Sequence, residues 1–127
     1  MLVVDTSCWI EWLTDGAIGS QIEAQMPVRE DILVPTLVQL ELTKWLMRER
    51  GEEIADEVLA YTEKCRVIAL DTRIALLAAE ACRTHGLTTA DAIIFATAQH
   101  HGASLLTCDA HFEGLPSVTY LSKKSAE

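Results

Sequence analysis

Short runs of apolar residues recur along the chain, and most of them end at a polar residue that favours a turn or the start of a helix. Such segments predict β-strands at Leu2–Val4, Ile32–Val34, Val67–Leu70, Ser104–Leu106 and the pair Val118 and Tyr120. Their apolar residues are consecutive rather than alternate, so both faces of each strand should be covered. This pattern is typical of a buried parallel sheet.

The segments between these strands have the periodicity of helices. We expect a short first helix from about Ser7 and further helices over Thr36–Arg50, Glu52–Tyr61, Thr72–Thr84 and Thr88–His101. In the helix that begins at Thr36, the side that faces the core should consist of Leu37, Leu40, Trp45 and Leu46. Strands that alternate with helices predict an α/β sandwich with right-handed crossovers.

Composition limits where the protein works and what it binds. The chain has 127 residues, enough for one compact domain. Its 10 lysines and arginines against 19 acids give a net charge of −9, which argues against nucleic-acid binding unless bound cations reverse the local charge. Neither a secretory leader nor an apolar stretch of about twenty residues is present, and the four widely spaced cysteines are best explained as buried, reduced thiols. We therefore expect a cytoplasmic protein that does not enter membranes.

Three aspartates sit at positions that allow either a local or a functional interpretation. Sheets of this kind bind ligands beyond the carboxyl ends of their strands, and Asp5 and Asp109 each come shortly after a predicted strand. Asp5 could instead cap the first helix, and Asp109 could cap a turn through His111. Asp91 lies three residues after Thr88, which is the spacing of a capping pair.

Glu41 is harder to explain locally, because it shares a helix face with Leu37 and Trp45. A pairing with Lys44 is the alternative to a functional role. An unpaired carboxylate that faces a core costs several kcal/mol, and crowded carboxylates protonate unless a cation lies among them. Oxygen ligands without clustered cysteine or histidine select Mg²⁺ or Mn²⁺, the metals of phosphate chemistry.

Four segments in this order resemble the PIN-domain family, and within it the VapC toxins of bacterial toxin–antitoxin pairs. They are Val3–Ser7, Leu40–Leu42, Leu87–Ala98 and His101–Phe112, and together they span nearly the whole chain. The resemblance implies a three-layer sandwich with a parallel sheet of about five strands in the order 3-2-1-4-5, flanked by helices. It also implies a single nuclease domain over residues 1–122, followed by a polar tail over residues 123–127.

The resemblance implies an endoribonuclease that uses one or two Mg²⁺ or Mn²⁺ ions and leaves 5′-phosphate and 3′-hydroxyl ends. The residues that match the metal-binding and catalytic acids of the family are Asp5, Glu41, Asp91 and Asp109. Thr107 matches a hydroxyl residue beside the site, and Ser7 should order the first loop. Many relatives have a further acid at the position of His111. A ligand role and a proton-transfer role are open for His111, and we favour a plain surface histidine.

The resemblance further implies a homodimer that is inhibited by a VapB-type antitoxin, whose C-terminal segment crosses the acidic site. Lys44 and Arg48 are candidates for contacts with RNA phosphates, because they follow Glu41 on its helix. Trp9 and Trp12 could line a groove for a partner helix, although packing in the core is the interpretation we favour.

Three other functions compete with this one. A phosphohydrolase with Asp5 as nucleophile would need a second acid at the position of Ser7. A phospho-accepting receiver domain would need paired acids after the first strand and a late lysine, and the sequence has neither. A PIN-like protein that only binds its partner would not need all four acids.

Overall fold

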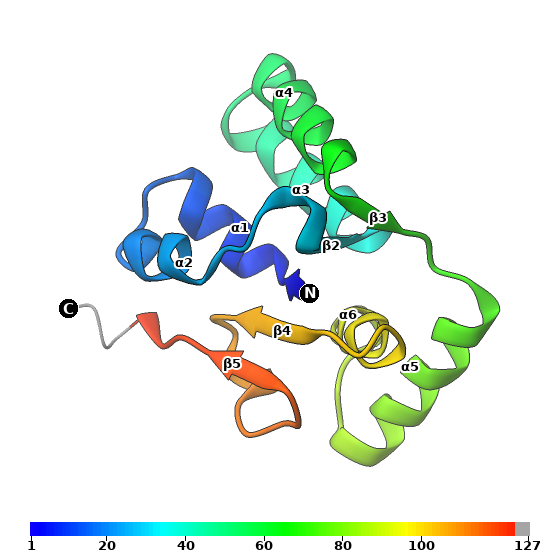
Figure 1. Ribbon diagram of the computed structural model, residues 1–127. Helices are drawn as coiled ribbons and strands as arrows, with labels where there is room; N and C mark the ends of the chain where they lie inside the picture. The colour runs from blue at the N-terminus through cyan, green and yellow to red at the C-terminus, as the bar shows by residue number, and fades with distance from the viewer. Residues whose placement is uncertain (124–127) are drawn as a thin grey trace.

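The predicted strands form one parallel sheet in the computed structural model, which describes residues 1–123 (Figure 1). The strands are β1 (Leu2–Val4), β2 (Ile32–Pro35), β3 (Arg66–Ile68), β4 (Ser104–Thr107) and β5 (Val118–Tyr120). Their order in the sheet is β3-β2-β1-β4-β5, which confirms the order that the family resemblance implied. The strand order therefore reverses between β1 and β4, where Leu2 lies opposite Ser104.

Helices cover the sheet on both faces and produce the expected three layers. They are α1 (Thr6–Leu13), α2 (Gly19–Gln25), α3 (Thr36–Glu49), α4 (Glu52–Lys64), α5 (Thr72–His85) and α6 (Thr89–His100), with short 3₁₀ turns η1 (Arg29–Asp31) and η2 (Ala110–Phe112). Helix α6 packs on β1, β2 and β4, and α5 packs on α6. Figure 1 shows this pair on the right of the sheet, with α1 and α2 on the left and α4 at the top.

Several details of the predicted elements are wrong, and one is the third strand, which ends at Ile68 instead of Leu70. The sequence pattern missed α2, because this short helix buries only Gly19 and Ile22 and has no long apolar stripe. Helix α4 continues to Lys64 instead of ending at Tyr61. Leu40 is 60% exposed, so it does not belong to the core side of α3, whose buried residues are Val38, Leu42 and Leu46. The side of α3 that faces the core is therefore rotated about the helix axis, relative to the side that we expected from the sequence.

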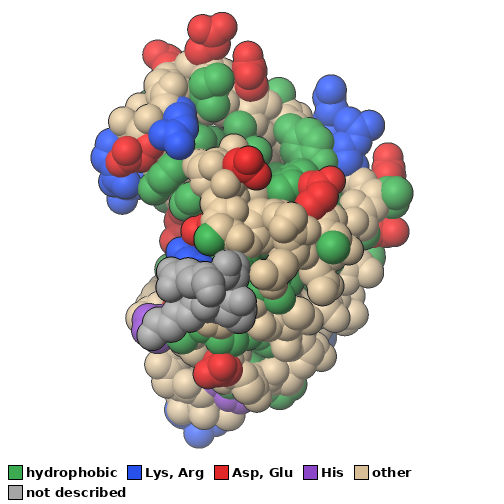
Figure 2. Space-filling model, turned by 90° about the vertical axis from the view of Figure 1, so that its left-hand side faces the viewer, with side chains coloured by type: hydrophobic (Ala, Val, Ile, Leu, Met, Phe, Trp, Pro, Cys, Tyr) green, Lys and Arg blue, Asp and Glu red, His purple; other side chains and the backbone are tan. Residues whose placement is uncertain are grey.

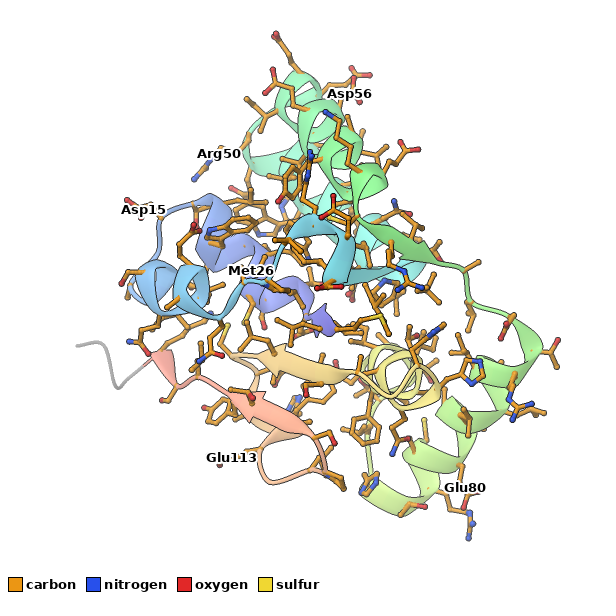
Figure 3. The ribbon with its side chains drawn as sticks, in the orientation of Figure 1. Asp15, Met26, Arg50, Asp56, Glu80 and Glu113 are labelled. Atoms are coloured by element: carbon orange, nitrogen blue, oxygen red, sulfur yellow. The ribbon has the colours of Figure 1, made fainter. Side chains whose placement is uncertain are left out.

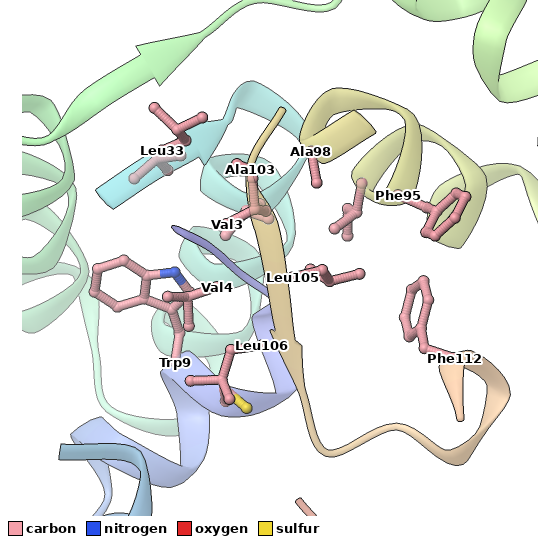
Figure 4. Packing of buried hydrophobic residues seen from close by; sticks show 14 of the residues in the cluster. Val3, Val4, Trp9, Leu33, Phe95, Ala98, Ala103, Leu105, Leu106 and Phe112 are labelled. Atoms are coloured by element: carbon pink, nitrogen blue, oxygen red, sulfur yellow. The ribbon is translucent and has the colours of Figure 1, made fainter. Parts of the chain in front are cut away.

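The core lies on both faces of the sheet at the central strands β1, β2 and β4, as their consecutive apolar residues require. The edge strands differ from the prediction that both faces of each strand are covered, because β3 has Arg66 and Val67 exposed and β5 is only partly buried. Figure 4 shows Trp9 beside Leu106 on one side of β4, and Phe95 and Phe112 beside Leu105 on the other. Each of the three aromatic side chains is at most 1% exposed. Burial of a side chain of this size contributes about 1.5–3 kcal/mol. The structure thus confirms that Trp9 packs in the core.

Trp12 is only partly buried and continues this packing towards the surface. Its ring centroid lies 5.6 Å from that of Trp9 and 6.2 Å from that of Tyr61. A cavity of about 250 Å³ opens beside it, lined by Trp12, Leu13, Glu57, Val58 and Tyr61. Trp12 thus packs against the core as well and also lines this cavity, while a partner helix in the cavity stays a prediction.

Helix α6 is the most deeply buried helix of the described residues and brings Asp91 to the rim of the sheet. From Ala92 to Ala98, only Ile93 is not fully buried. The buried hydroxyl of Thr97 donates a hydrogen bond to the Ile93 carbonyl oxygen at 2.7 Å, so it is not left unpaired. Because the packed middle of α6 fixes the helix, the position of Asp91 in its first turn is fixed as well.

The described chain ends on a short segment after β5 that returns to α1. Lys123 Nζ lies 3.3 Å from Glu11 Oε1, so the first residue of the predicted tail makes an ion pair with the domain. The rest of that predicted tail, residues 124–127, lies outside the described residues. Within residues 1–123, no helix combines the length and the apolar character that crossing a membrane requires.

Candidate metal centre

Asp5 occupies the point where β1 ends and α1 begins, directly beside β4. Its backbone N–H donates to the Leu106 carbonyl oxygen at 2.9 Å, which continues the pairing of β1 with β4. Although Asp5 is the N-cap residue of α1, its side chain makes no capping hydrogen bond. The carboxylate instead accepts hydrogen bonds at Oδ2 from Ser7 Oγ, at 2.7 Å, and from Thr107 Oγ1, at 2.9 Å. The capping interpretation of this side chain is therefore wrong.

The environment of Asp5 opposes its charge. The residue is 4% exposed, and this burial raises the pKa of its carboxyl group. The hydrogen bonds from Ser7 and Thr107 lower the pKa, while the nearby charges of Asp91 and Asp109 raise it further. No lysine, arginine or histidine of residues 1–123 forms an ion pair with Asp5. Asp5 is a buried acid that lacks a counter-ion within the described chain.

Asp109 is held in place by the loop that follows β4. Its backbone N–H donates to Thr107 Oγ1 at 2.9 Å, so Thr107 connects Asp109 to Asp5. Asp109 Oδ1 accepts a hydrogen bond from the His111 N–H at 2.9 Å, which confirms that Asp109 caps the turn through His111. The same turn carries the His111 ring over the site, with Nδ1 3.3 Å from Asp109 Oδ1.

Asp91 reaches the same place from the first turn of α6. Thr88 Oγ1 accepts a hydrogen bond from the Asp91 N–H at 3.4 Å, so the predicted capping contact exists. That contact uses the backbone N–H of Asp91. The carboxylate of Asp91 interacts with the side chains of Thr88 and His111, and its Oδ2 lies 3.5 Å from His111 Nδ1. Burial raises the pKa of the Asp91 carboxyl, and the charge of Asp109 raises it further. Capping and a functional role are therefore compatible at this residue.

Asp91, Asp109 and His111 can each offer one ligand atom, and these atoms all lie within 4.8 Å of one another. The negatively charged carboxylates of Asp5, Asp91 and Asp109 repel one another. Carboxylate oxygens are hard ligands that suit a divalent cation. A bound cation would attract each carboxylate and so offset the repulsion between them. The residues present thus fit the Mg²⁺ or Mn²⁺ ion that the sequence led us to expect.

Glu41 is half-buried on α3 and does not belong to the group of Asp91, Asp109 and His111 whose ligand atoms lie within 4.8 Å of one another. It forms no ion pair within residues 1–123, so the predicted alternative of a pairing with Lys44 is wrong. Thr6 Oγ1 instead donates to Glu41 Oε1 at 2.7 Å. Because Thr6 follows Asp5 directly, this hydrogen bond ties α3 to the end of β1. This contact of Thr6 with Glu41 could not be predicted, since a hydroxyl next to an acid carries no separate signal.

A cavity of about 370 Å³ begins at Glu41 and Thr6 and extends between α1 and α3. Both predicted RNA contacts line it, and the complete lining is Thr6, Ile10, Leu37, Leu40, Glu41, Lys44, Trp45 and Arg48. Two cations in a chain of net charge −9 thus line the same cavity as Glu41.

The thiols of Cys8 and Cys108 lie next to Ser7, the residue that donates a hydrogen bond to Asp5. The Cys8 and Cys108 Sγ atoms are 3.6 Å apart, and the Cys108 N–H donates to Ser7 Oγ at 3.3 Å. The hydrogen bond with Cys8 holds the pKa of the Cys108 thiol below its usual value, at about 7. All four cysteines are free in the structure, and Cys8, Cys65 and Cys108 are buried as expected, whereas Cys82 is only half-buried. Nothing in the sequence indicated that Cys8 and Cys108 would meet.

Several solved structures share this fold. A toxin–antitoxin complex from Klebsiella pneumoniae gives a TM-score of 0.81 at 22% identity, covering 94% of this chain and 96% of that chain. VapC20 from Mycobacterium tuberculosis gives 0.75 at 21% identity, covering 93% and 97%. FitAcB from Neisseria gonorrhoeae gives 0.75 at 20% identity, covering 98% and 99%. Identities this low show similarity of fold.

The family of this protein is identified by comparing its sequence with known proteins and with family models. A search of curated proteins finds no match to this chain. The family model of the PIN domain, however, matches residues 2–117, which include Asp5, Glu41, Asp91 and Asp109. This match agrees with the resemblance that the four sequence segments indicated. The chain belongs to the PIN-domain family.

Proposed function

We propose that this protein is a metal-dependent endoribonuclease that acts as the toxin of a type II toxin–antitoxin pair. The observation that carries the proposal is the clustering of Asp91, Asp109 and His111 near Asp5, a buried acid that forms no ion pair with a basic residue among residues 1–123. Membership of the PIN-domain family supports the same chemistry.

One or two bound Mg²⁺ or Mn²⁺ ions would supply an activated water and stabilise charge on the phosphate. The ligands would be Asp5, Asp91 and Asp109, with Glu41 at the edge. Ser7 and Thr107 both donate to Asp5 Oδ2 and so orient Asp5 Oδ1 for binding. Thr6 occupies Glu41 Oε1, which leaves Oε2 to bind the ion or to accept a proton from the attacking water.

RNA would enter along the cavity between α1 and α3. Lys44 and Arg48 line this cavity next to Glu41, so they can bind phosphates on one side of the cleaved bond. The rest of the acidic surface repels RNA, and the bound ion therefore has to reverse the charge of the site before the substrate binds.

The descriptions of several similar solved structures support the proposal that this protein is a toxin with an antitoxin partner. One solved structure is titled a toxin–antitoxin complex, another is VapC20, described as a sarcin–ricin loop cleaving toxin, and a third is a DNA-bound VapBC complex from Salmonella typhimurium. A carboxylate-lined site on a chain of net charge −9 should attract a basic segment of a VapB-type antitoxin. We place the protein in the cytoplasm, where its free thiols remain reduced.

We also expect a homodimer. Leu40 and Met47 are 60% and 53% exposed on the outer side of α3. An open apolar depression lies between them, lined by Gln39, Leu40, Thr43, Lys44, Met47 and Arg48. Burial of exposed large apolar side chains against a second copy would remove them from water.

A phosphohydrolase with Asp5 as nucleophile is less well supported. Such an enzyme needs a second acid at the position of Ser7 as its proton donor. Ser7 instead donates a hydrogen bond to Asp5 Oδ2, and Asp5 is only 4% exposed. Both features suit a metal ligand better than a nucleophile that forms a covalent bond to phosphorus.

The test is cleavage of RNA by the purified chain, separated from any partner, in Mg²⁺, Mn²⁺ or chelator. We expect cleavage only with metal, with 5′-phosphate and 3′-hydroxyl ends identified by sequencing of the fragments. Asp91→Asn should lose activity, whereas Glu53→Gln, a charge-matched change on the exposed side of α4, should keep it. Cleavage that persists in chelator, or in Asp91→Asn, would contradict the proposal, and a folded chain that binds metal without cleaving would indicate a binding protein.

A further inference from the structure

We propose that His111 is a ligand of the metal centre and makes the centre selective for Mn²⁺ over Mg²⁺. This inference rests on the proposed function, because it concerns the ion that the acids hold. It replaces the plain surface histidine that the sequence favoured.

The spacing of the donor atoms fits coordination of a single ion. Ligands at neighbouring corners of an octahedron lie about 3 Å apart when each bond is about 2.1 Å long. His111 Nδ1 lies 3.3 Å from Asp109 Oδ1 and 3.5 Å from Asp91 Oδ2. Small side-chain shifts suffice to place all three around one ion.

The turn that carries His111 is rigid, although its side chain is 72% exposed. The His111 N–H donates to Asp109 Oδ1, and the next residue, Phe112, is 0% exposed in the core. A buried anchor on one side and a capping hydrogen bond on the other fix the backbone of η2. The fixed backbone therefore places the His111 side chain next to Asp91 and Asp109, within reach of both.

Asp5 provides independent support that a cation belongs here. Asp5 is only 4% exposed. Of its two carboxylate oxygens, only Oδ2 accepts hydrogen bonds from residues 1–123. The second oxygen, Oδ1, has no hydrogen-bond donor among those residues, and no described cation pairs with Asp5. An oxygen of this carboxylate that accepts no hydrogen bond from the described residues is available to a cation.

The selectivity follows from the chemistry of the donors. Mg²⁺ prefers oxygen ligands, keeps its water and gains most from negative charge. Mn²⁺ accepts imidazole nitrogen more readily, and affinity for nitrogen donors rises along the first transition series. A neutral imidazole in place of a carboxylate removes one negative charge from the centre, which weakens Mg²⁺ binding most. The nitrogen ligand compensates for this loss with Mn²⁺.

The decisive comparison is between wild type, His111→Asp and His111→Ala, with calorimetric titration of Mn²⁺ and of Mg²⁺ into each folded protein. We expect His111→Asp to lower the ratio of Mn²⁺ to Mg²⁺ affinity by about tenfold or more. His111→Ala should weaken Mn²⁺ binding and leave Mg²⁺ binding little changed. His100→Asp is the matched control, because it makes the same change of charge on an exposed residue at the far end of α6 from Asp91.

Pulsed electron paramagnetic resonance of the Mn²⁺-loaded protein gives a second readout that does not involve activity. With ¹⁵N-labelled histidine, we expect a nitrogen coupling in wild type and His100→Asp that is lost in His111→Ala. Absence of the coupling in wild type, or equal metal ratios in wild type and His111→Asp, overturns the assignment of His111 while leaving the nuclease proposal intact. Failure of wild type to bind either ion overturns both.

Discussion

The acidic side chains of this protein occupy two regions with opposite surroundings. Helix α4 carries Glu52, Glu53, Asp56, Glu57 and Glu63, all of them exposed. Acidic side chains stand at the top of Figure 2, where α4 lies, and Figure 3 shows Asp56 on α4 pointing away from the body of the molecule. At the carboxyl edge of the sheet, by contrast, Asp5 is buried and Asp91 and Asp109 are partly buried around it.

The difference shows that the number of acids in a region does not by itself indicate a site. The acids of α4 remain hydrated, so their charges have little effect on the free energy of unfolding and mainly affect solubility. The acids at the sheet edge lose water and repel one another, which raises the pKa values of Asp5 and Asp91. Only the second arrangement should gain stability from a divalent ion. We therefore predict that equal changes of charge have unequal effects in the two regions.

The largest contrast should appear in RNA cleavage. Asp5→Asn keeps an acceptor for Ser7 and Thr107 but removes the charge that holds the ion. We expect a loss of cleavage rate greater than about 100-fold, since even residues that only support metal ligands account for about 10–100-fold. Glu53→Gln, on α4, should cleave at the parental rate. Similar rates for both variants, measured under single-turnover conditions, would remove the distinction between the two regions.

Removal of a hydroxyl that orients Asp5 should have a smaller effect. Thr107→Val keeps the shape of the side chain but cannot donate to Asp5 Oδ2, and we expect Mn²⁺ affinity to fall by about 10–100-fold. Thr97→Val is the control, because Thr97 is equally buried but donates to the Ile93 carbonyl oxygen inside α6. Calorimetry of both variants checks this, and equal losses of affinity would mean that the Thr107 hydroxyl only supports the fold.

The cations beside the site should have modest effects on substrate binding. Lys44→Ala and Arg48→Ala should each raise KM several-fold with little change in kcat, and each should reduce the salt dependence of RNA binding by about one ion. Lys64→Ala, at the end of α4, should change neither quantity. An unchanged salt dependence in Lys44→Ala and Arg48→Ala would show that RNA does not follow the cavity between α1 and α3.

The smallest expected effect concerns stability in chelator. Because folding raises the pKa of Asp91 above its ordinary value of 3.8, ionisation destabilises the folded state. This penalty is absent at low pH, grows as the pH rises through 3.8 towards the folded pKa, and is complete above it. Asp91→Asn should therefore melt at a higher temperature than the parent at pH 7, and the difference should shrink on acidification. A variant that melts well below the parent at pH 7 would favour a purely capping role for Asp91.

Much of the fold could be predicted because apolar runs and helical periodicity report directly on burial. The strands and most helices follow from that pattern, and the placement of Asp5 and Asp109 at the carboxyl edge follows from the strand ends. The strand order, by contrast, came from the family resemblance, since local patterns do not contain it. Helix α2 and the exposed Leu40 were misjudged because a short helix and a broad apolar face give weak periodic signals.

The finer structure of the site could not be predicted from the sequence. Whether Thr6 contacts Glu41, or Cys8 contacts Cys108, depends on side chains that are 35 and 100 residues apart in the chain. The orientation of His111 depends likewise on the anchor at Phe112 and on the position of Asp91 on another element. Such contacts are set by tertiary packing, whereas the identities of the four acids are visible in the sequence.

The most direct test of the central claim is anomalous diffraction from crystals of the protein soaked in Mn²⁺. We predict an anomalous peak within about 2.2 Å of carboxylate oxygens from both Asp91 and Asp109 and close to Asp5. No such peak should lie along α4, despite its greater number of acids. Manganese scattered over α4, or a site in which these aspartates bind only backbone amides and hydroxyls, would contradict the account.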